Sequence, residues 1–374
     1  TGSGQVSLGD IQTEFGGSNP IGMSEYYGKG NAPASSGEMQ LAADFYGTSD
    51  ASFMTATGGS VTTDGDYKVH SFTGSGTFQV TALGVGQGAA NDQVDFLIVA
   101  GGGCGGSGYA NGGSSYTLAG GTYQGYYPSA AGGGGAGGYR NSYSSESSGG
   151  GASSMTIATV SASSYTVTIG AGGSSQVSQY DCQGTNGSTS SFNSVSGTGG
   201  GAGAAHTGHS GQTGGSGGGG TVKTGQHNQQ GTMNPGSGTS NQGYAGGARG
   251  LHNSTSVYGG GGGGASAAGN KSGNWWQGIQ SSGGDGLASS ITGSSVTRGG
   301  GGGGGTGYSN SNAGGPGGSG GGGTGGKYYY GPGGGSGSAN TGGGGGGSGM
   351  TDETGTPAGG NGGSGVVILR YKFQ

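Results

Sequence analysis

Charge is scarce in this sequence: only 7% of the 374 residues are charged, against roughly a quarter in typical soluble proteins. The formal net charge is −5, so the chain lacks the basic surface through which proteins bind nucleic acids. Proline is also rare, with 7 residues, and the glycines follow no strict period of three, which excludes collagen. No apolar run approaches the ~18 residues of a membrane-spanning helix, so no insertion into a membrane is expected.

Cysteine is limited to Cys104 and Cys182, which form no CxxC motif. The N-terminus shows neither a basic segment nor an apolar segment of the kind found in secretory signals. We therefore expect synthesis in a reducing cytoplasm, which favours two free thiols over one disulfide.

Glycine is the dominant residue, with 113 copies, whereas hydrophobic residues make up only 27%. Residues 1–100 hold 18 Gly and 12 charges, but residues 101–365 hold 95 Gly and 11 charges. This shift predicts a small N-terminal module over 1–48, a β-sheet domain over 49–100 and a glycine-rich domain over 101–365. Within the first module, LGDIQTEF predicts a short helix that Gly16 and Gly17 end.

Strand patterns begin after residue 50. YKVHSF and TFQVTAL alternate apolar and polar residues, and VDFLIVA (94–100) is typical of a strand buried on both faces. Further strands are predicted within 153–170 and 365–373, so the chain is expected to return to the sheet at its end and to complete it.

The glycine-rich region contains blocks of glycine separated by loops of varied composition. Glycine loses the most backbone entropy on folding and buries no side chain, so only backbone hydrogen bonds between blocks can compensate. We therefore predict a mostly β protein with a non-classical part, a bundle of about ten polyglycine II helices that displays variable loops. The alternative is a flexible Gly/Ser linker. The glycines expected at scaffold positions are Gly134, Gly261, Gly302 and Gly344.

The loops carry three aromatic clusters, and such rings in Gly/Ser/Asn surroundings resemble the chemistry of antibody paratopes. They are candidate receptor-binding residues, although rings that pack the ends of the bundle or a subunit seam remain an equal alternative. Four cations lie in or beside the loops, and they either meet anionic glycans or are solvated by water. They are Arg140, Arg249, Lys271 and Lys327. The aromatic clusters are Tyr116, Tyr123, Tyr126 and Tyr127; Trp275 and Trp276; and Tyr328, Tyr329 and Tyr330.

No motif indicates catalysis. The GxGxxG matches are expected by chance in a chain so rich in glycine, and none opens a helix in a βαβ unit. His206 and His209, with His227 nearby, favour a polar loop over a metal site, which needs three or four ligands. Asp64 and Asp66 favour a hairpin turn over a calcium site. The remaining acids are scattered, so we expect no enzyme, no cofactor and no metal.

Five segments, in their order along the chain, resemble the glycine-rich domains of bacteriophage tail-fibre and receptor-binding proteins. The N-terminal segment VSLGDIQTEFGGSNPIGMSEYYGKG is similar to a module at the start of many phage fibre proteins. The five segments are VDFLIVAGGG (94–103), GGGGAGGYR (132–140), YTVTIGAGG (165–173), GGDGLASSITGSSV (283–296) and GGNGGSGVVILRY (359–371).

The resemblance implies a virion protein, made in the host cytoplasm, whose loops on a polyglycine II scaffold bind host surface sugars or outer-membrane proteins. The chain has no long shaft of repeats, so residues 1–48 are expected to mount it directly on other tail proteins. Related fibres are often homotrimers. Two alternatives stay open: a purely structural virion component and, less favoured, an ice-binding protein, since some antifreeze proteins also use polyglycine II bundles.

Overall fold

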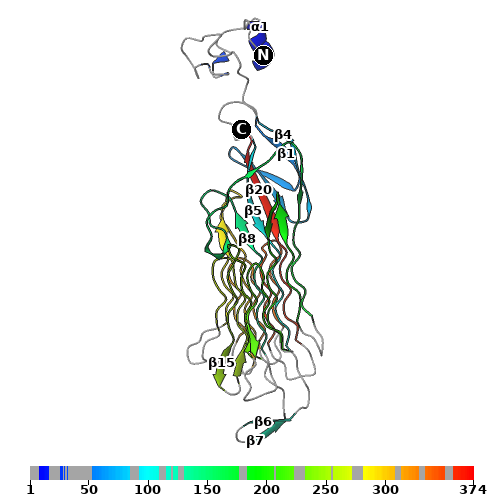
Figure 1. Ribbon diagram of the computed structural model, residues 1–374, viewed down its shortest axis with the longest axis vertical. Helices are drawn as coiled ribbons and strands as arrows, with labels where there is room; N and C mark the ends of the chain where they lie inside the picture. Colours follow the sequence, from blue (N-terminus) through cyan, green and yellow to red (C-terminus); the bar gives the residue numbers. More distant parts are fainter. Residues whose placement is uncertain are drawn as a thin grey trace.

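The computed structural model is an elongated molecule (Figure 1), with α1 (Leu8–Phe15) at one end and β-sheets next to it. Extended glycine segments follow, and the β6–β7 hairpin lies at the opposite end. The structure describes residues 8–16, 26–27, 29, 32, 53–84, 92–108, 115–118, 121–124, 130–176, 183–205, 208–222, 232–253, 256–271, 281–307, 313–327, 333–349 and 357–374. The domain boundaries near residues 48 and 100 stay predictions.

The central element is an antiparallel sheet of six strands, in which β20 pairs with both β3 and β5. The register places Val367 opposite Ile98 in β5 and opposite Phe72 in β3. The C-terminal strand therefore joins two strands from the first hundred residues. The strands are β2 (Ser60–Asp64), β3 (Tyr67–Phe72), β20 (Val366–Lys372), β5 (Gln93–Val99) and β8 (Tyr139–Asn141) in order, with β9 (Ala158–Thr159) paired to β5.

A second sheet has the order β1-β4-β10 and covers one face of the first. Its strands are β1 (Thr55–Thr57), β4 (Gly76–Ala82) and β10 (Ser164–Val167). Phe78 from β4 packs with Phe96 and Leu369, and all three side chains are fully buried. The ring of Phe192, from the β11–β12 hairpin (Ser190–Phe192 and Val195–Gly197), stands edge-on to Phe78 at 5.9 Å. This is the larger hydrophobic core.

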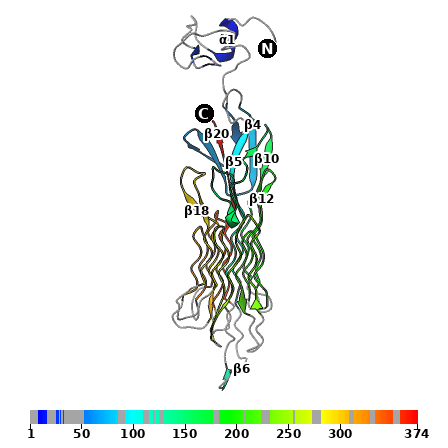
Figure 2. The same cartoon turned by 60° about the vertical axis from the view of Figure 1, so that its left-hand side comes forward.

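The opposite face of the central sheet has its own core, because alternate residues of a strand point to opposite faces. Leu97 and Ile368 pack there against Tyr139 and Ile291. Ile291 lies between β17 (Leu287–Ser289) and β18 (Val296–Arg298). Figure 2 shows β18 on one side of β5 and β10 with β12 on the other. The strand predicted from VDFLIVA is thus buried on both faces.

The N-terminal helix α1 begins at Leu8 and ends at Phe15, as LGDIQTEF predicts. Gly16 follows with φ 76°, and its N–H donates to the carbonyl oxygen of Gln12 (2.9 Å), which is the usual glycine stop of a helix. Ile11 packs with Tyr26 in a small cluster of its own. No helix among the described residues is long and apolar enough to cross a membrane.

The predicted bundle of about ten polyglycine II helices is wrong. In the part of the chain that the structure describes, regular structure is almost all β-sheet, at 26% strand, with one α-helix and no helix bundle. The glycine blocks lie instead as extended segments between the sheets and β15 (Figure 1), and together we call them the glycine slab. The slab comprises the described residues of 101–108, 130–138, 170–189, 198–220, 234–249, 259–286, 299–305, 313–349 and 357–365.

The hydrogen bonds of the slab run between segments that are distant in the sequence. The amide of Gly133 donates to the carbonyl oxygen of Gly260 (3.0 Å), and the next amide, of Gly134, donates to Gly345 (2.7 Å). Successive amides thus reach different neighbours, which spreads the bonding sideways through the slab. This is the physical reason for the correction: the bonds needed to offset the entropy of glycine are made between extended segments.

Candidate functional site

The glycine slab is closely packed, and most of its interior glycines have no room for a side chain. Each predicted scaffold glycine is buried there, and an added Cβ would collide with a backbone carbonyl oxygen of a neighbouring segment, such as that of Gly345 at Gly302. Such packing makes the slab a rigid support. The four scaffold glycines are Gly134, Gly261, Gly302 and Gly344.

The segments that carry the first and third aromatic clusters leave the slab at the same place. The first segment begins after Gly108, whose amide donates to Oγ of Ser348 (2.5 Å), and it ends before Ala131, whose amide donates to the carbonyl oxygen of Ser348 (3.1 Å). The third begins after Lys327, and a Cβ at Gly349 would collide with the carbonyl oxygen of Lys327. Ser348 and Gly349 therefore lie beside the bases of both segments.

The second aromatic segment returns to the same place. Its first described residue after the tryptophans is Ser281, whose carbonyl oxygen accepts a hydrogen bond from Gly304 (2.8 Å). The next amide, of Gly305, donates to Ala131 (2.9 Å), where the first aromatic segment ends. Three segments that are far apart in sequence thus start or end on one group of neighbours.

Short strand pairs lie at this end of the slab and tie the loops together. In Figure 1, β15 and the β6–β7 hairpin lie at the end remote from α1. Thr221 Oγ1 donates to the carbonyl oxygen of Ala130, which links β13 to the first aromatic segment. We call this region the loop end. Its strands are β6 (Ser115–Leu118), β7 (Gly121–Gln124), β13 (Thr221–Val222), β14 (Thr232–Met233), β15 (Gly250–Asn253), β16 (Ser256–Tyr258) and β19 (Thr306–Gly307).

Two of the predicted aromatic residues lie on described strands. Tyr116 in β6 and Tyr123 in β7 are partners in the antiparallel register of that hairpin. The other seven lie outside the described residues: Tyr126, Tyr127, Trp275, Trp276, Tyr328, Tyr329 and Tyr330. Their assignment as receptor-binding residues stays a prediction. The structure describes the residues at the bases of the segments that carry them.

The four cations singled out in the sequence do not all lie with the aromatic segments. Lys271 and Lys327 are exposed, and each precedes one of these segments. Arg140 lies instead on β8 of the central sheet, opposite Ile98. The sequence reasoning missed this separation because nothing in the pattern GGYR shows that a strand begins at Tyr139.

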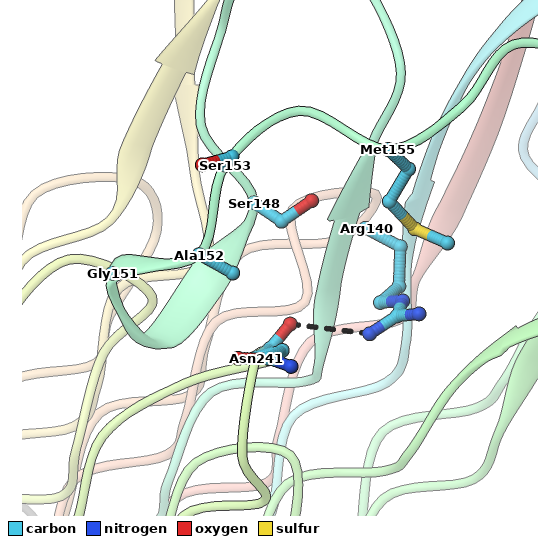
Figure 3. A pocket seen from close by; sticks show the side chains of 7 residues that line it. All are labelled: Arg140, Ser148, Gly151, Ala152, Ser153, Met155 and Asn241. Atoms are coloured by element: carbon cyan, nitrogen blue, oxygen red, sulfur yellow. Dashed lines mark hydrogen bonds between the residues drawn. The ribbon is translucent and has the colours of Figure 1, made fainter.

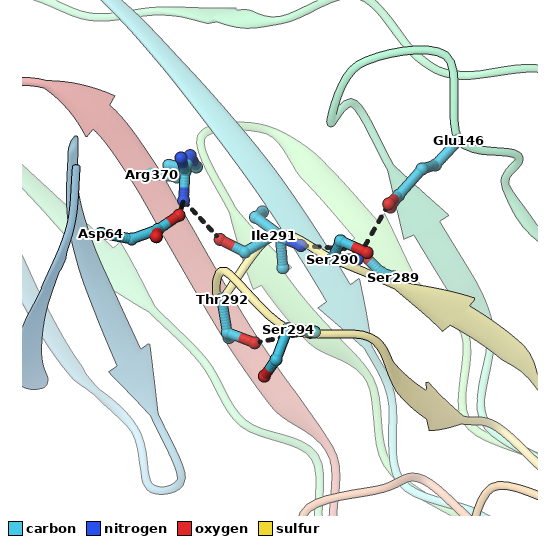
Figure 4. A network of polar contacts seen from close by, with 8 residues as sticks. All are labelled: Asp64, Glu146, Ser289, Ser290, Ile291, Thr292, Ser294 and Arg370. Carbon is cyan, nitrogen blue, oxygen red and sulfur yellow. Dashed lines mark hydrogen bonds and ion pairs between the residues drawn. The ribbon is translucent and has the colours of Figure 1, made fainter. Parts of the chain in front are cut away.

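A polar network next to the sheet explains the acidic pair near residue 65 (Figure 4). Asp64 Oδ2 lies 2.7 Å from Nη1 of Arg370, and the same Nη1 donates to the carbonyl oxygen of Ile291 (3.2 Å). The guanidinium of Arg370 also lies over the ring of Tyr67 (4.2 Å). β2 and β3 are paired as far as Asp64 and Tyr67, so the chain turns at Gly65 and Asp66. The prediction of a hairpin turn here is confirmed. The network holds the β17–β18 hairpin on the sheet, a role that the sequence did not reveal.

Among the described residues, no group of three His, Cys, Asp or Glu side chains is placed to hold a metal ion. His206 and His227 lie outside the described residues, as does Cys182. Cys104 is a free, buried thiol, and burial raises its pKa to about 12. A thiol with so high a pKa is a poor nucleophile at neutral pH.

Comparison with known families gives one match. The family model described as a glycine-rich domain matches residues 126–372, which is more than half of the chain. The match begins within the first aromatic segment and ends at the last residue of β20, so it spans most of the slab and the closing strand. No curated protein is similar enough to the chain to match it.

Proposed function

The chain belongs to the glycine-rich domain family, and within that family we propose that it is a bacteriophage adhesin. In this proposal it is part of the virion tail or fibre and binds a host surface receptor, a glycan or an outer-membrane protein, through the loop end. It binds without catalysis. Residues 1–48 attach it to other tail proteins, with a homotrimer as the assembly.

One observation carries the proposal: three aromatic segments, separated along the chain, have their bases on one group of slab residues around Ser348. A rigid support that brings variable loops together is the arrangement by which many scaffolds present binding loops. Tyr and Trp then supply a large contact area at low cost in conformational entropy.

The distribution of charge agrees with recognition of a neutral or weakly anionic surface. The glycine-rich region 101–365 holds only 11 charged residues, so long-range electrostatic attraction is weak there. Exposed Lys271 and Lys327 precede two of the aromatic segments, where they are available to an anionic group of a glycan. The resemblance to phage fibre proteins supplies the biological setting of the proposal.

The test replaces the aromatic clusters and measures adsorption separately from assembly. Two variants are made, one with Tyr328, Tyr329 and Tyr330 changed to Ser and one with Trp275 and Trp276 changed to Ser. The fluorescently labelled chain is then scored for binding to a panel of bacterial cells, and virions that carry each variant are scored for assembly and adsorption. We expect assembled particles that no longer adsorb.

The matched control is Val61→Ser, which removes an exposed apolar side chain (49% exposed) from β2, at the sheet end. It is expected to leave adsorption unchanged. If both aromatic variants prevent assembly, the loops make subunit contacts and the purely structural alternative replaces the adhesin. Unchanged adsorption in both variants also contradicts the proposal, and thermal hysteresis of the purified chain would identify an ice-binding protein instead.

A further inference from the structure

A pocket of about 380 Å³ opens beside β8, far from the loop end (Figures 1 and 3). Its volume is within the range of about 300–1,000 Å³ that is usual for small-molecule sites. Arg140 lies on one side with Asn241, and Ser148 and Ser153 lie on the other, with Met155 above Arg140 in the view of Figure 3. The pocket thus combines a cation, hydroxyl groups, an amide and one apolar side chain.

The cation in this pocket lacks an anionic partner. Arg140 Nη1 donates to the backbone carbonyl oxygen of Asn241 at 3.3 Å, which is a long hydrogen bond. Its Nε is buried and makes no hydrogen bond, and no carboxylate among the described residues pairs with the guanidinium. A guanidinium that no carboxylate neutralises can pair with an anion from solution, and the group that fits it best is a planar anion that accepts two hydrogen bonds.

The walls of the pocket are held in place by backbone contacts. Tyr139, next to Arg140, donates its amide to Gln242, next to Asn241, at 3.0 Å. On the other wall, Gly150 donates to Ala265 (2.9 Å). Asn241 has φ 62°, a left-handed conformation that Asn tolerates better than most residues. The pocket is therefore already formed before any ligand binds, which lowers the entropic cost of binding.

Two polar side chains are available beside Arg140. The hydroxyl of Ser153 and the side-chain amide of Asn241 make no hydrogen bond with other described residues, and both residues are exposed. Ser148, in contrast, is engaged: its Oγ accepts from the amide of Asn141 (3.0 Å). One free cation beside a free hydroxyl and a free amide matches a small molecule with one negative charge and several hydroxyl groups.

We propose that this pocket binds the carboxylate of an acidic monosaccharide unit, with the guanidinium of Arg140 on the carboxylate and Ser153 and Asn241 on the ring hydroxyls. The single cation suits a monoanion such as a carboxylate better than a phosphate monoester, which carries nearly two charges at neutral pH. The side chain of Met155 supplies an apolar surface for the C–H groups of the ring. The site is separate from the loop end, so it does not depend on the function proposed above.

The test titrates the full chain with acidic sugars and their neutral parents, by saturation-transfer NMR and calorimetry. The probes are galacturonate, glucuronate and N-acetylneuraminate, with galactose and glucose as uncharged counterparts and galactose 6-sulfate as a second type of monoanion. At least one carboxylated sugar is expected to bind, its neutral counterpart is not, and Arg140→Gln is expected to lower the affinity by about tenfold or more.

Two further variants make the result specific. Asn241→Gly keeps the left-handed backbone and removes the amide, so it is expected to weaken binding even if Arg140→Gln does not fold. Lys372→Gln removes one positive charge from the end of β20, away from the pocket and from the loop end, and is expected to change nothing. The Ser variant at Tyr328, Tyr329 and Tyr330 is expected to bind the acidic sugar normally, so the two proposals can fail independently.

The outcomes that overturn the proposal are equally definite. They are no binding of any acidic sugar, equal binding of acidic and neutral sugars, and unchanged affinity in both the Arg140→Gln and Asn241→Gly variants. Tighter binding of galactose 6-sulfate than of every carboxylated sugar would overturn the assignment to a carboxylate.

Discussion

Glycine at position 302 is required by its neighbours rather than by its own backbone angles. A Cβ at this position would collide with the carbonyl oxygen of Gly345, which belongs to an adjacent segment of the slab. We expect Gly302→Ala to lower the free energy of unfolding by about 1–3 kcal/mol or more, because the two segments must move apart and stretch their hydrogen bonds. Urea unfolding of the variant and the wild type measures the difference.

The control for this prediction is Gly74→Ala. Gly74 lies in the turn between β3 and β4, and an added Cβ would meet no atom within 4 Å. This substitution is expected to change the stability by no more than about 0.5 kcal/mol. Equal stability of the Gly302→Ala and Gly74→Ala variants would show that the slab is loosely packed.

His70 makes the stability of the sheet region depend on pH. Its side chain is fully buried, its Nδ1 lies 2.6 Å from the carbonyl oxygen of Gly58, and its Nε2 has no partner. Burial lowers the pKa of His70, and the charge of Lys68 adds to this effect, although the bond to Gly58 opposes it. The folded state therefore keeps the imidazole neutral at a pH where the unfolded chain already binds a proton.

The sign of the pH effect follows from linkage. Because the pKa of His70 is lower in the folded state, its contribution to stability is complete above the unfolded value of about 6.5 and is lost as the pH falls below it. We expect the urea midpoint to decrease between pH 7 and pH 5, and His70→Gln to remove most of that decrease. His209→Gln serves as the control and is expected to keep it. A wild-type midpoint that stays constant over this range would contradict the prediction.

At the scale of elements, the β17–β18 hairpin is attached to the central sheet by side chains at its turn. Arg370, only 6% exposed, bonds to the carbonyl oxygen of Ile291 and pairs with Asp64, and Glu146 Oε1 accepts from the amide of Ser290 (2.8 Å). Gly293 has φ 86° and passes so close to the Asp64 carboxylate that a Cβ would come within 2.7 Å of it. The turn therefore fits closely over the ion pair.

This arrangement predicts that Asp64→Asn loosens the hairpin. The side chain of Asp64 is 41% exposed, so solvent screens the pair, and we expect a global loss of only about 1 kcal/mol. The local effect is larger, because Arg370 is left as a buried cation, and faster hydrogen exchange is expected at Leu287–Ser289 and Val296–Arg298. The control is Asp66→Asn, in the turn beside β2. Exchange that is unchanged in Asp64→Asn would show that the Asp64–Arg370 pair does not hold the hairpin.

Strands with a clear apolar pattern were predictable from the sequence, and the less patterned ones were not. YKVHSF is β3, VDFLIVA covers all of β5 except its first residue, and GVVILRYKF contains β20. In contrast, β11 and β12 are only three residues each and consist mostly of Ser, Gly and single apolar residues. Their one signal is the turn Asn193-Ser194, where both residues have positive φ, as a two-residue hairpin requires.

The glycine blocks show a different limit. Their composition predicts backbone bonding between blocks, but it does not define a helix, and the predicted polyglycine II helices are absent from the described residues. The partner of each amide depends on packing between distant segments, as with Gly134 and Gly345, and no local pattern encodes that choice. For the same reason, the pocket at Arg140 and Asn241 joins residues whose proximity the sequence does not indicate.

At the scale of the whole molecule, the closing strand connects the central sheet with the glycine slab. β20 pairs with β3 and β5, and directly before it Gly362 and Gly363 bond to Gly173 and Gly343 of the slab (2.8 Å each). Because these contacts join segments far apart in the chain, the sheet and the slab are expected to form as one cooperative unit.

Amide hydrogen exchange on the intact chain tests this view. Amides in the interior of the slab, such as those of Gly134 and Gly302, donate to neighbours at 2.7 and 2.9 Å and are buried, so they can exchange only when segments separate. If the slab and sheet are one unit, these amides are expected to exchange at the same slow rate as those of Val367 and Leu369 in β20. Gly74, which is exposed and outside any strand, is expected to exchange fast and serves as the internal control. Slab amides that exchange as fast as Gly74 would mean that the glycine segments are a flexible tether, and a rigid support for the loop end would then be lost.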